Sequence, residues 1–148
     1  MALSIRRYDI SDRDRMLAIF DANTPAFFAV GEREDFARYL DENALRYEVC
    51  EQDSAIVAGF AVAPGTMGRA HLNWILVDPA AQGGGIGNAM MDAACQRALD
   101  QGAAMLDIAA SQHSAPFFLR HGARALGRTD NGWGPDMHRI DMELPLGA

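Results

Sequence analysis

The stretch from Leu72 to Gly102, LNWILVDPAAQGGGIGNAMMDAACQRALDQG, has the pattern of a strand, a glycine-rich turn and a helix. Leu72 to Val77 is an apolar run of strand length, and Asp78-Pro79 ends it because proline cannot donate to a sheet ladder. Residues 86–98 repeat apolar side chains at spacings of three and four, which indicates one apolar helix face. Gly102 stands where a helix-ending glycine is common. We therefore predict a strand–turn–helix unit here.

The turn of this unit, Gln82 to Gly87, is rich in glycine. A helix start leaves about four backbone N–H groups without partners, at the positive end of the helix dipole. Glycines let a ligand approach these groups, so the turn predicts a phosphate or pyrophosphate site. Two common phosphate motifs fit poorly. The dinucleotide fingerprint needs a third glycine where Asn88 stands, and the P-loop needs a lysine, which this chain lacks.

The bulk composition excludes several classes of protein. A chain of 148 residues with 49% hydrophobic and 22% charged residues is typical of a globular protein and favours a single domain, 1–148. A net charge of −7 with scattered arginines argues against a nucleic-acid partner, and no apolar run has membrane-spanning length. Cys50 and Cys95 indicate free thiols in a reducing compartment, so we expect a cytoplasmic protein. The histidines lack metal-ligand spacing, so we expect no metal.

Outward from the central unit, the chain alternates between strand and helix patterns. Strands are predicted at 3–9, 45–51, 55–63, 104–109, 123–128 and 137–144, helices at about 11–22, 33–43 and 114–121, and a polar loop at 130–135. Ser11 is the expected cap of the first helix. The resulting order, β-α-α-β-β-β-α-β-α-β-β, predicts an α/β fold with a mixed sheet, in which the strands on either side of the central helix run parallel.

Gln82, Gly85 and Gly87 fit the pattern Q/R-x-x-G-x-G/A directly after a strand that ends in Val-Asp-Pro. This resembles the acyl-CoA-binding motif of the GCN5-related N-acetyltransferase (GNAT) family. The segment SQHSAPFFLRHGA, 111–123, is similar to the family's segment ending in F/L-Y-x-x-x-G-F. The resemblance covers about residues 3–145. It implies the GNAT fold, a mixed twisted sheet with helices on both faces.

The resemblance also implies acetyl-CoA as the co-substrate. In the family, the strand before the turn splays away from the next parallel strand, and the pantetheine arm pairs with its backbone. By this resemblance, Ile75, Leu76 and Val77 hold the pantetheine, and Phe117, Phe118 and Arg120 line the far side of the cofactor. The pyrophosphate is expected on the backbone N–H groups of Gln82, Gly83, Gly84, Gly85, Ile86, Gly87 and Asn88.

The implied reaction is direct acetyl transfer to a primary amine of a small molecule, an amino acid or a peptide. The amine must lose a proton to attack. Because side chains alternate along a strand, we expect His71 and Asn73 to share a face with Ile75 and Val77, which makes His71 a candidate base. His113, His138 and Glu32 are further candidates. A backbone N–H near Val77 is the expected oxyanion donor.

Phe118 stands where many family members have a proton-donating tyrosine, so water or Ser111 is the expected substitute. By the same resemblance, Phe27, Phe28, Glu32, Trp74 and Trp133 are candidates for the acceptor pocket. Two alternatives stay open: a non-catalytic acyl-CoA-binding module of the same fold, and a nucleotide-binding α/β domain. The acceptor and the oligomeric state also stay open, although family members are often dimers, so a homodimer is one option.

Overall fold

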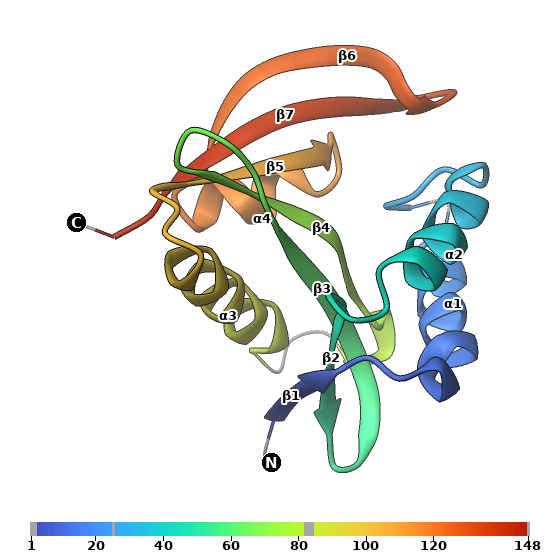
Figure 1. Cartoon of the computed structure of the whole chain (residues 1–148). Helices are drawn as coiled ribbons and strands as arrows, with labels where there is room; N and C mark the ends of the chain where they lie inside the picture. Colours follow the sequence, from blue (N-terminus) through green and yellow to red (C-terminus); the bar gives the residue numbers. More distant parts are fainter. Residues whose placement is uncertain (1–2, 25, 82–84, 148) are drawn as a thin grey trace.

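Figure 1 shows a computed structural model of the chain, which describes residues 3–24, 26–81 and 85–147. Its centre is a seven-stranded sheet with the order β1-β2-β3-β4-β5-β7-β6. In the described chain, β4 and β5 form a parallel pair and the other neighbouring strands are antiparallel. The strands are β1 (Leu3–Arg7), β2 (Glu48–Gln52), β3 (Ala55–Pro64), β4 (Arg69–Val77), β5 (Met105–Ser111), β6 (Arg124–Gly134) and β7 (Met137–Pro145).

Helices cover both faces of this sheet (Figure 1). The helices α1 (Arg13–Ala22) and α2 (Glu32–Glu42) pack on one face, and α3 (Ile86–Asp100) and α4 (Ala115–Arg120) on the other. Two short 3-10 helices, η1 (Ile10–Asp12) and η2 (Pro79–Ala81), precede α1 and the glycine-rich turn. A mixed sheet between two helical layers confirms the predicted fold class.

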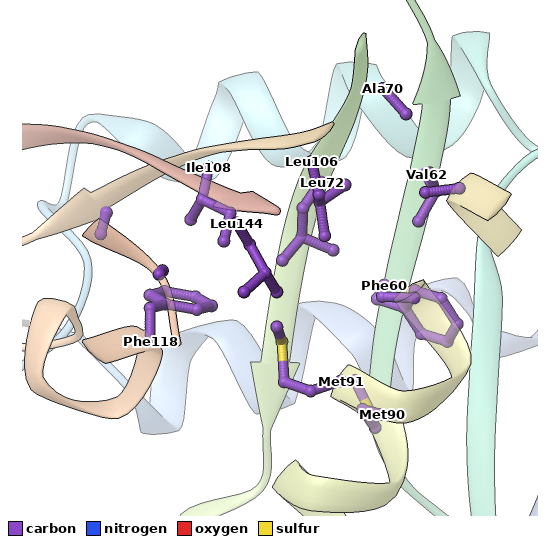
Figure 2. Packing of buried hydrophobic residues seen from close by; sticks show 14 of the residues in the cluster. Phe60, Val62, Ala70, Leu72, Met90, Met91, Leu106, Ile108, Phe118 and Leu144 are labelled. Carbon is purple, nitrogen blue, oxygen red and sulfur yellow. The ribbon is translucent and has the colours of Figure 1, made fainter. Parts of the chain in front are cut away.

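Two hydrophobic clusters hold the layers together, one on each face of the sheet. The α3 side buries Phe60, Leu72, Met90, Leu106 and Phe118 with their neighbours, as Figure 2 shows. The α1–α2 side buries a second cluster, which contains Met16, Ile19, Phe20, Phe36, Leu40, Tyr47 and Leu76. Burial of apolar side chains at about 25 cal/mol per Å² makes these two clusters the main source of stability.

A β-bulge at Trp74 reverses the faces of β4 halfway along its length. Between the pairs Gly59↔Leu76 and Ala61↔Asn73, β4 advances one residue more than β3 does. Trp74 takes the left-handed conformation there, with φ of 49°. Leu72 therefore packs on the α3 side, whereas Leu76, of the same parity, packs on the α1–α2 side.

The prediction that His71, Asn73, Ile75 and Val77 share one face of the strand is wrong because of this bulge. His71 and Asn73 precede the bulge and lie on the face opposite Leu72. Ile75 and Val77 follow it and pack against the α3-side cluster. One inserted residue moves every later side chain to the other face of a strand.

The parallel strands β4 and β5 separate in their second halves. Their pairing runs from Arg69↔Met105 to Leu72↔Ile108 and ends there, although β4 continues to Val77 and β5 to Ser111. β5 stays paired with β7 over its whole length. The edge of β4 after Leu72 thus faces a gap in the middle of the sheet.

Other differences from the predicted elements are local. Asp9, and not Ser11, caps the first helical segment: its carboxylate accepts the backbone N–H of Ser11, and the carboxylate of Asp12 accepts that of Asp9. The predicted loop at 130–135 is mostly strand, because β6 continues with an irregular register to Gly134. Strands on antiparallel ribbons tolerate such polar, glycine-containing ends when one side is exposed.

Candidate functional site

A cavity of about 690 Å³ occupies the gap between β4 and β5 and extends under the α1–α2 loop. Its lining comes from the start of α3, the second halves of β4 and β5, α4, the α1–α2 loop with the first residue of α2, and the end of β6. Its volume lies within the range of small-molecule sites, about 300–1,000 Å³. The structure thus brings together most of the residues singled out in the sequence.

The start of α3 forms one end of the cavity. Gly85, Ile86, Gly87 and Asn88 line it. The sequence predicts that these residues bind a pyrophosphate, and this role stays a prediction. Gly85 is the N-cap with φ of 77°, no side chain of the described residues caps the helix, and its first turn contains no acidic residue. The free N–H groups of this turn therefore meet no competing carboxylate within the helix. The predicted contacts of Gln82, Gly83 and Gly84 lie outside the described residues.

The helix α4 forms the wall beside this end. Phe117, Phe118 and Arg120 all line the cavity. A Cβ on Gly87 would lie 2.9 Å from the Phe117 ring, so a larger residue at this position would require that ring to shift. Phe118 is buried in the α3-side cluster. The Arg120 guanidinium lies 6.0 Å from the centre of the Phe117 ring, which leaves its charge at the α3 end.

The middle of the cavity is the unpaired edge of β4. Ile75, Leu76 and Val77 line it. Two side chains hold the backbone of this segment from the α1–α2 side: the Tyr47 hydroxyl donates to the carbonyl of Trp74 at 2.8 Å, and Asn23 Nδ2 donates to that of Val77 at 3.0 Å. Sequence reasoning missed both roles. Asn23 looked only like a helix breaker, and no local pattern marks Tyr47.

The α1–α2 loop and the end of β6 form the other end. Phe27, Phe28, Glu32 and Trp74 line the cavity there, together with Trp133. The rings of Phe28 and Trp74 lie 6.1 Å apart, and the indole N–H of Trp133 donates to the carbonyl of Ala110 at 2.9 Å. These residues meet where the resemblance put the acceptor, and their role in binding an acceptor stays a prediction.

Glu32 is the acidic side chain at this end. It is buried at the start of α2, and its carboxylate accepts the backbone N–H of Ala29 at 2.8 Å. Burial raises the pKa of Glu32 to about 7, and the hydrogen bond from Ala29 opposes the rise. A carboxyl group with such a pKa can take and return a proton near neutral pH.

The three predicted catalytic residues divide between the cavity and the surface. Asn73 and Ser111 line the cavity. Asn73 donates to the Tyr39 hydroxyl at 3.3 Å, and Ser111 Oγ accepts the backbone N–H groups of His113 and Ser114, each at 3.2 Å.

His71, the third of them, does not line the cavity. It is exposed, with Nδ1 3.6 Å from Asp107 Oδ2 on the neighbouring strand. Of the other candidate bases, His113 lines the cavity and His138 does not. His138 Nδ1 instead accepts the backbone N–H of Asn131 in the β6–β7 hairpin.

Two absences concern the residues that the structure describes. No group of three or more histidine, cysteine or acidic side chains in these residues is arranged to hold a metal ion. No helix in the same residues combines the length and apolar character needed to cross a membrane.

The chain was compared with known proteins by family model, by sequence and by structure. The model of the acetyltransferase (GNAT) family matches residues 16–123. No curated protein matches the sequence. Ard1 from Thermoplasma volcanium is similar in structure, with a TM-score of 0.84 at 14% identity over 100% of both chains.

Two other solved structures show the same fold. Ribosomal-protein-alanine N-acetyltransferase from Brucella melitensis has a TM-score of 0.71 at 20% identity, over 97% of this chain and 99% of that one. N-acetylglutamate synthase from Neisseria gonorrhoeae, complexed with coenzyme A and N-acetyl-glutamate, has a TM-score of 0.79 at 17% identity, over 100% of this chain and 36% of that one.

Proposed function

We propose that this chain, which belongs to the acetyltransferase (GNAT) family, moves an acetyl group from acetyl-CoA to a primary amine held beside Glu32. Members of the family are acyltransferases that use acetyl-CoA, and the chain is therefore an enzyme of this class. One observation carries the proposal: a single cavity joins the uncapped start of α3, the unpaired edge of β4 and a buried carboxyl group.

The residues at the α3 end suit the pyrophosphate of acetyl-CoA. The backbone N–H groups from Gly85 to Asn88 lie at the positive end of a helix of 15 residues, without a side-chain cap. Arg120 supplies a cation at the same end, as a partner for a further phosphate. This lining is an anion site built mainly from the main chain.

The edge of β4 suits the pantetheine arm. Its pairing with β5 ends at Leu72, so the backbone of Ile75, Leu76 and Val77 borders the gap. An arm with amide groups can pair there as an added strand does. The hydrogen bonds from Tyr47 and Asn23 hold two carbonyls of this segment from the α1–α2 side of the sheet, so the strand is fixed before the arm binds.

Glu32 suits the role of general base better than His71 does, because Glu32 lines the cavity and His71 does not. Acetyl-CoA, as the co-substrate, supplies the thioester carbon that the amine attacks and the thiolate that leaves. Glu32 takes the proton that the ammonium form of the acceptor must lose. A pKa of about 7 keeps much of this carboxyl group ionised at neutral pH, at a site where burial strengthens its attraction for a cation.

Backbone N–H groups near Val77 are the proposed donors to the developing oxyanion. The departing thiolate needs no strong acid, because a thiol has a pKa of about 8.5. Phe118 has no proton to give. Ser111 lines the cavity, and its oxygen accepts two N–H groups. Its hydroxyl can donate either to Ser114 Oγ, 3.4 Å away, or to a group in the cavity.

The test uses two measurements on the purified full chain. Acetyl-CoA is expected to raise the melting temperature, and NAD or ATP to leave it unchanged. A panel of primary amines is then expected to release free CoA thiol in a protein-dependent way. Stabilisation without thiol release from any amine would favour the acyl-CoA-binding module, and stabilisation by NAD or ATP alone would favour the nucleotide-binding domain.

A further inference from the structure

We infer that the acceptor is a small primary amine with an aromatic or aliphatic skeleton and no carboxylate. The inference rests on the proposed function, because it names the substrate class of the same site. It excludes free amino acids and the N-termini of folded proteins as main acceptors. The acceptor end is the end of the cavity that contains Phe27, Phe28, Glu32, Trp74 and Trp133. Three features of this end support the inference: its aromatic walls, its distribution of charge and a close contact between the two segments that flank it.

The walls of this end are aromatic. Phe27, Phe28, Trp74 and Trp133 come from three separate segments and all line the cavity. Phe27 is 37% exposed, whereas Phe28 and Trp74 pack against the α1–α2-side cluster. Aromatic faces attract an ammonium group and also cover an apolar skeleton. Glu32, buried among them, supplies the one carboxylate of the described lining.

The charges at this end oppose an acceptor with a carboxylate. Arg120 is the one guanidinium in the described lining, and it lies beside Phe117 at the α3 end. Arg139 stacks 5.2 Å from the centre of the Trp133 ring, but it lies outside the lining and pairs with Asp141 at 2.8 Å. The one further group of the described lining that can carry a positive charge is the imidazole of His113. The carboxylate of an amino acid would therefore be buried near Glu32 without a guanidinium to pair with, which is unfavourable.

A contact over this end limits the length of the acceptor. The end of β6 meets the α1–α2 loop, since a Cβ on Gly134 would lie only 2.9 Å from the Cβ of Ala29. The two segments lie on the same side of the molecule in Figure 1. An extended peptide needs an open groove in which its backbone can continue. We expect the close contact at this end to favour a compact amine over a chain that continues outward.

The experiment exploits the two tryptophans of the chain, Trp74 and Trp133, which both line the cavity. The protein is first saturated with CoA, and its tryptophan fluorescence is then titrated with four compounds at pH 8. Phenylethylamine carries the proposed features, and phenylalanine adds only a carboxylate. Phenylalaninamide replaces that carboxylate by a neutral group of similar size. A pentapeptide with N-terminal phenylalanine tests whether this end admits an acceptor that continues outward. Thiol release from acetyl-CoA with the same four compounds gives kcat/KM.

Phenylethylamine is expected to bind and react best, phenylalaninamide within about tenfold of it, and phenylalanine about 100-fold less well, because an unpaired buried carboxylate is costly. The pentapeptide is expected to give no detectable turnover. Equal or better use of phenylalanine or of the pentapeptide would overturn the inference, as would CoA binding with no response to any of the amines. If CoA itself changes neither the fluorescence nor the melting temperature, the proposed function fails first.

A pair of variants tests the missing cation directly. Phe27→Arg places a guanidinium at the exposed rim of the acceptor end and is expected to raise the ratio of phenylalanine to phenylethylamine kcat/KM about tenfold. Val30→Arg adds the same charge in the same loop, at a residue that is 75% exposed and does not line the cavity. It is expected to leave the ratio unchanged. An unchanged ratio in Phe27→Arg, with phenylethylamine still bound, would contradict the charge argument.

Discussion

The two ends of the cavity differ in the groups that form them, which are main-chain groups at one end and side chains at the other. At the α3 end, consecutive residues from Gly85 to Asn88 present main-chain N–H groups after an apolar strand. At the α1–α2 end, side chains converge from segments as far apart as Phe27, Trp74 and Trp133. The first end depends on local backbone geometry and the second on how distant elements pack.

This difference teaches where substitution changes binding and where it changes specificity. A main-chain site is altered by substitutions that add a side chain or a charge to the turn, and it tolerates many changes elsewhere. A side-chain site is altered one residue at a time, each with its own consequence for shape and charge. The predictions below separate the two ends, from the largest expected effect to the smallest.

The largest effect is expected from Glu32→Gln at the acceptor end. We expect kcat to fall about 10²–10⁴-fold, the usual contribution of a general base, while the affinity for acetyl-CoA stays within about threefold. Steady-state thiol release with phenylethylamine measures the first, and equilibrium titration the second. Glu34→Gln, on an exposed residue of the same helix turn, serves as the control. A loss of acetyl-CoA affinity equal to the loss in kcat would show that the ends are not separable.

The same variant should show a pH-dependent gain in stability. Because the folded pKa of Glu32, about 7, exceeds the ordinary value of 4.5, the stability that this group contributes is complete below pH 4.5 and is lost as pH rises through 7. Glutamine does not titrate. Urea unfolding should therefore find Glu32→Gln equal to the parent near pH 4.5 and more stable at pH 8, by up to about 3 kcal/mol. A constant difference across this range would contradict the pKa.

At the α3 end, Gly85→Asp is expected to weaken CoA binding about 100-fold, because it sets a carboxylate against the phosphates. Gly85→Asn is the matched control: it has the same shape, tolerates the left-handed conformation at this position and carries no charge. Thermal melting shows whether both variants fold equally, and titration with CoA gives the affinities. Equal affinities for the two variants would remove this turn from the site.

Tyr47→Phe tests the strand between the ends. It removes the hydroxyl that bonds to the carbonyl of Trp74 and leaves that carbonyl without its partner, which costs about 1–3 kcal/mol in the free energy of unfolding. Tyr8→Phe is the control, because Tyr8 is also buried and its hydroxyl forms no hydrogen bond within the described residues. A loss of unfolding free energy no larger than that of the control, measured by urea unfolding, would show that the bulge does not depend on the hydrogen bond from Tyr47.

The smallest effect is expected from His71→Ala. His71 is exposed and lies outside the cavity, so kcat/KM for the amine should stay within about twofold of the parent at pH 8. The assay is the same thiol release that is used for Glu32→Gln. A loss comparable to that of Glu32→Gln would return His71 to the candidate bases and weaken the contrast between the ends.

The sequence predicted the α3 end well because its signals are local. Glycines after an apolar strand specify a turn and a helix start whatever the rest of the chain does, and Gly85 and Gly87 lie where the pattern indicates. The order of strands and helices along the chain followed from the same kind of local pattern, whereas the two helical layers were implied by the family resemblance. The predicted lining residues at the other end, such as Phe27, came from the family resemblance and not from spacing.

What escaped prediction depends on contacts between distant segments. The bulge sits at Trp74, a residue type that rarely takes a positive φ, so no glycine marks it in the sequence. The bulge moves the later side chains of β4 to the opposite face, so His71 does not share a face with Ile75. Two further features arise only when α1, α2 and β4 pack together. They are the hydrogen bonds that Asn23 and Tyr47 donate to β4 and the raised pKa of Glu32.

The meeting of Gly134 and Ala29 has an evolutionary consequence. Both are among the smallest residues, and a Cβ at position 134 would lie only 2.9 Å from that of Ala29. A methyl group at position 134 would therefore require one of the two segments to shift, outside the residues proposed to bind the phosphates and to take the proton. Under the proposal above, such a substitution would be an evolutionary route to larger acceptors that leaves the proposed chemistry in place.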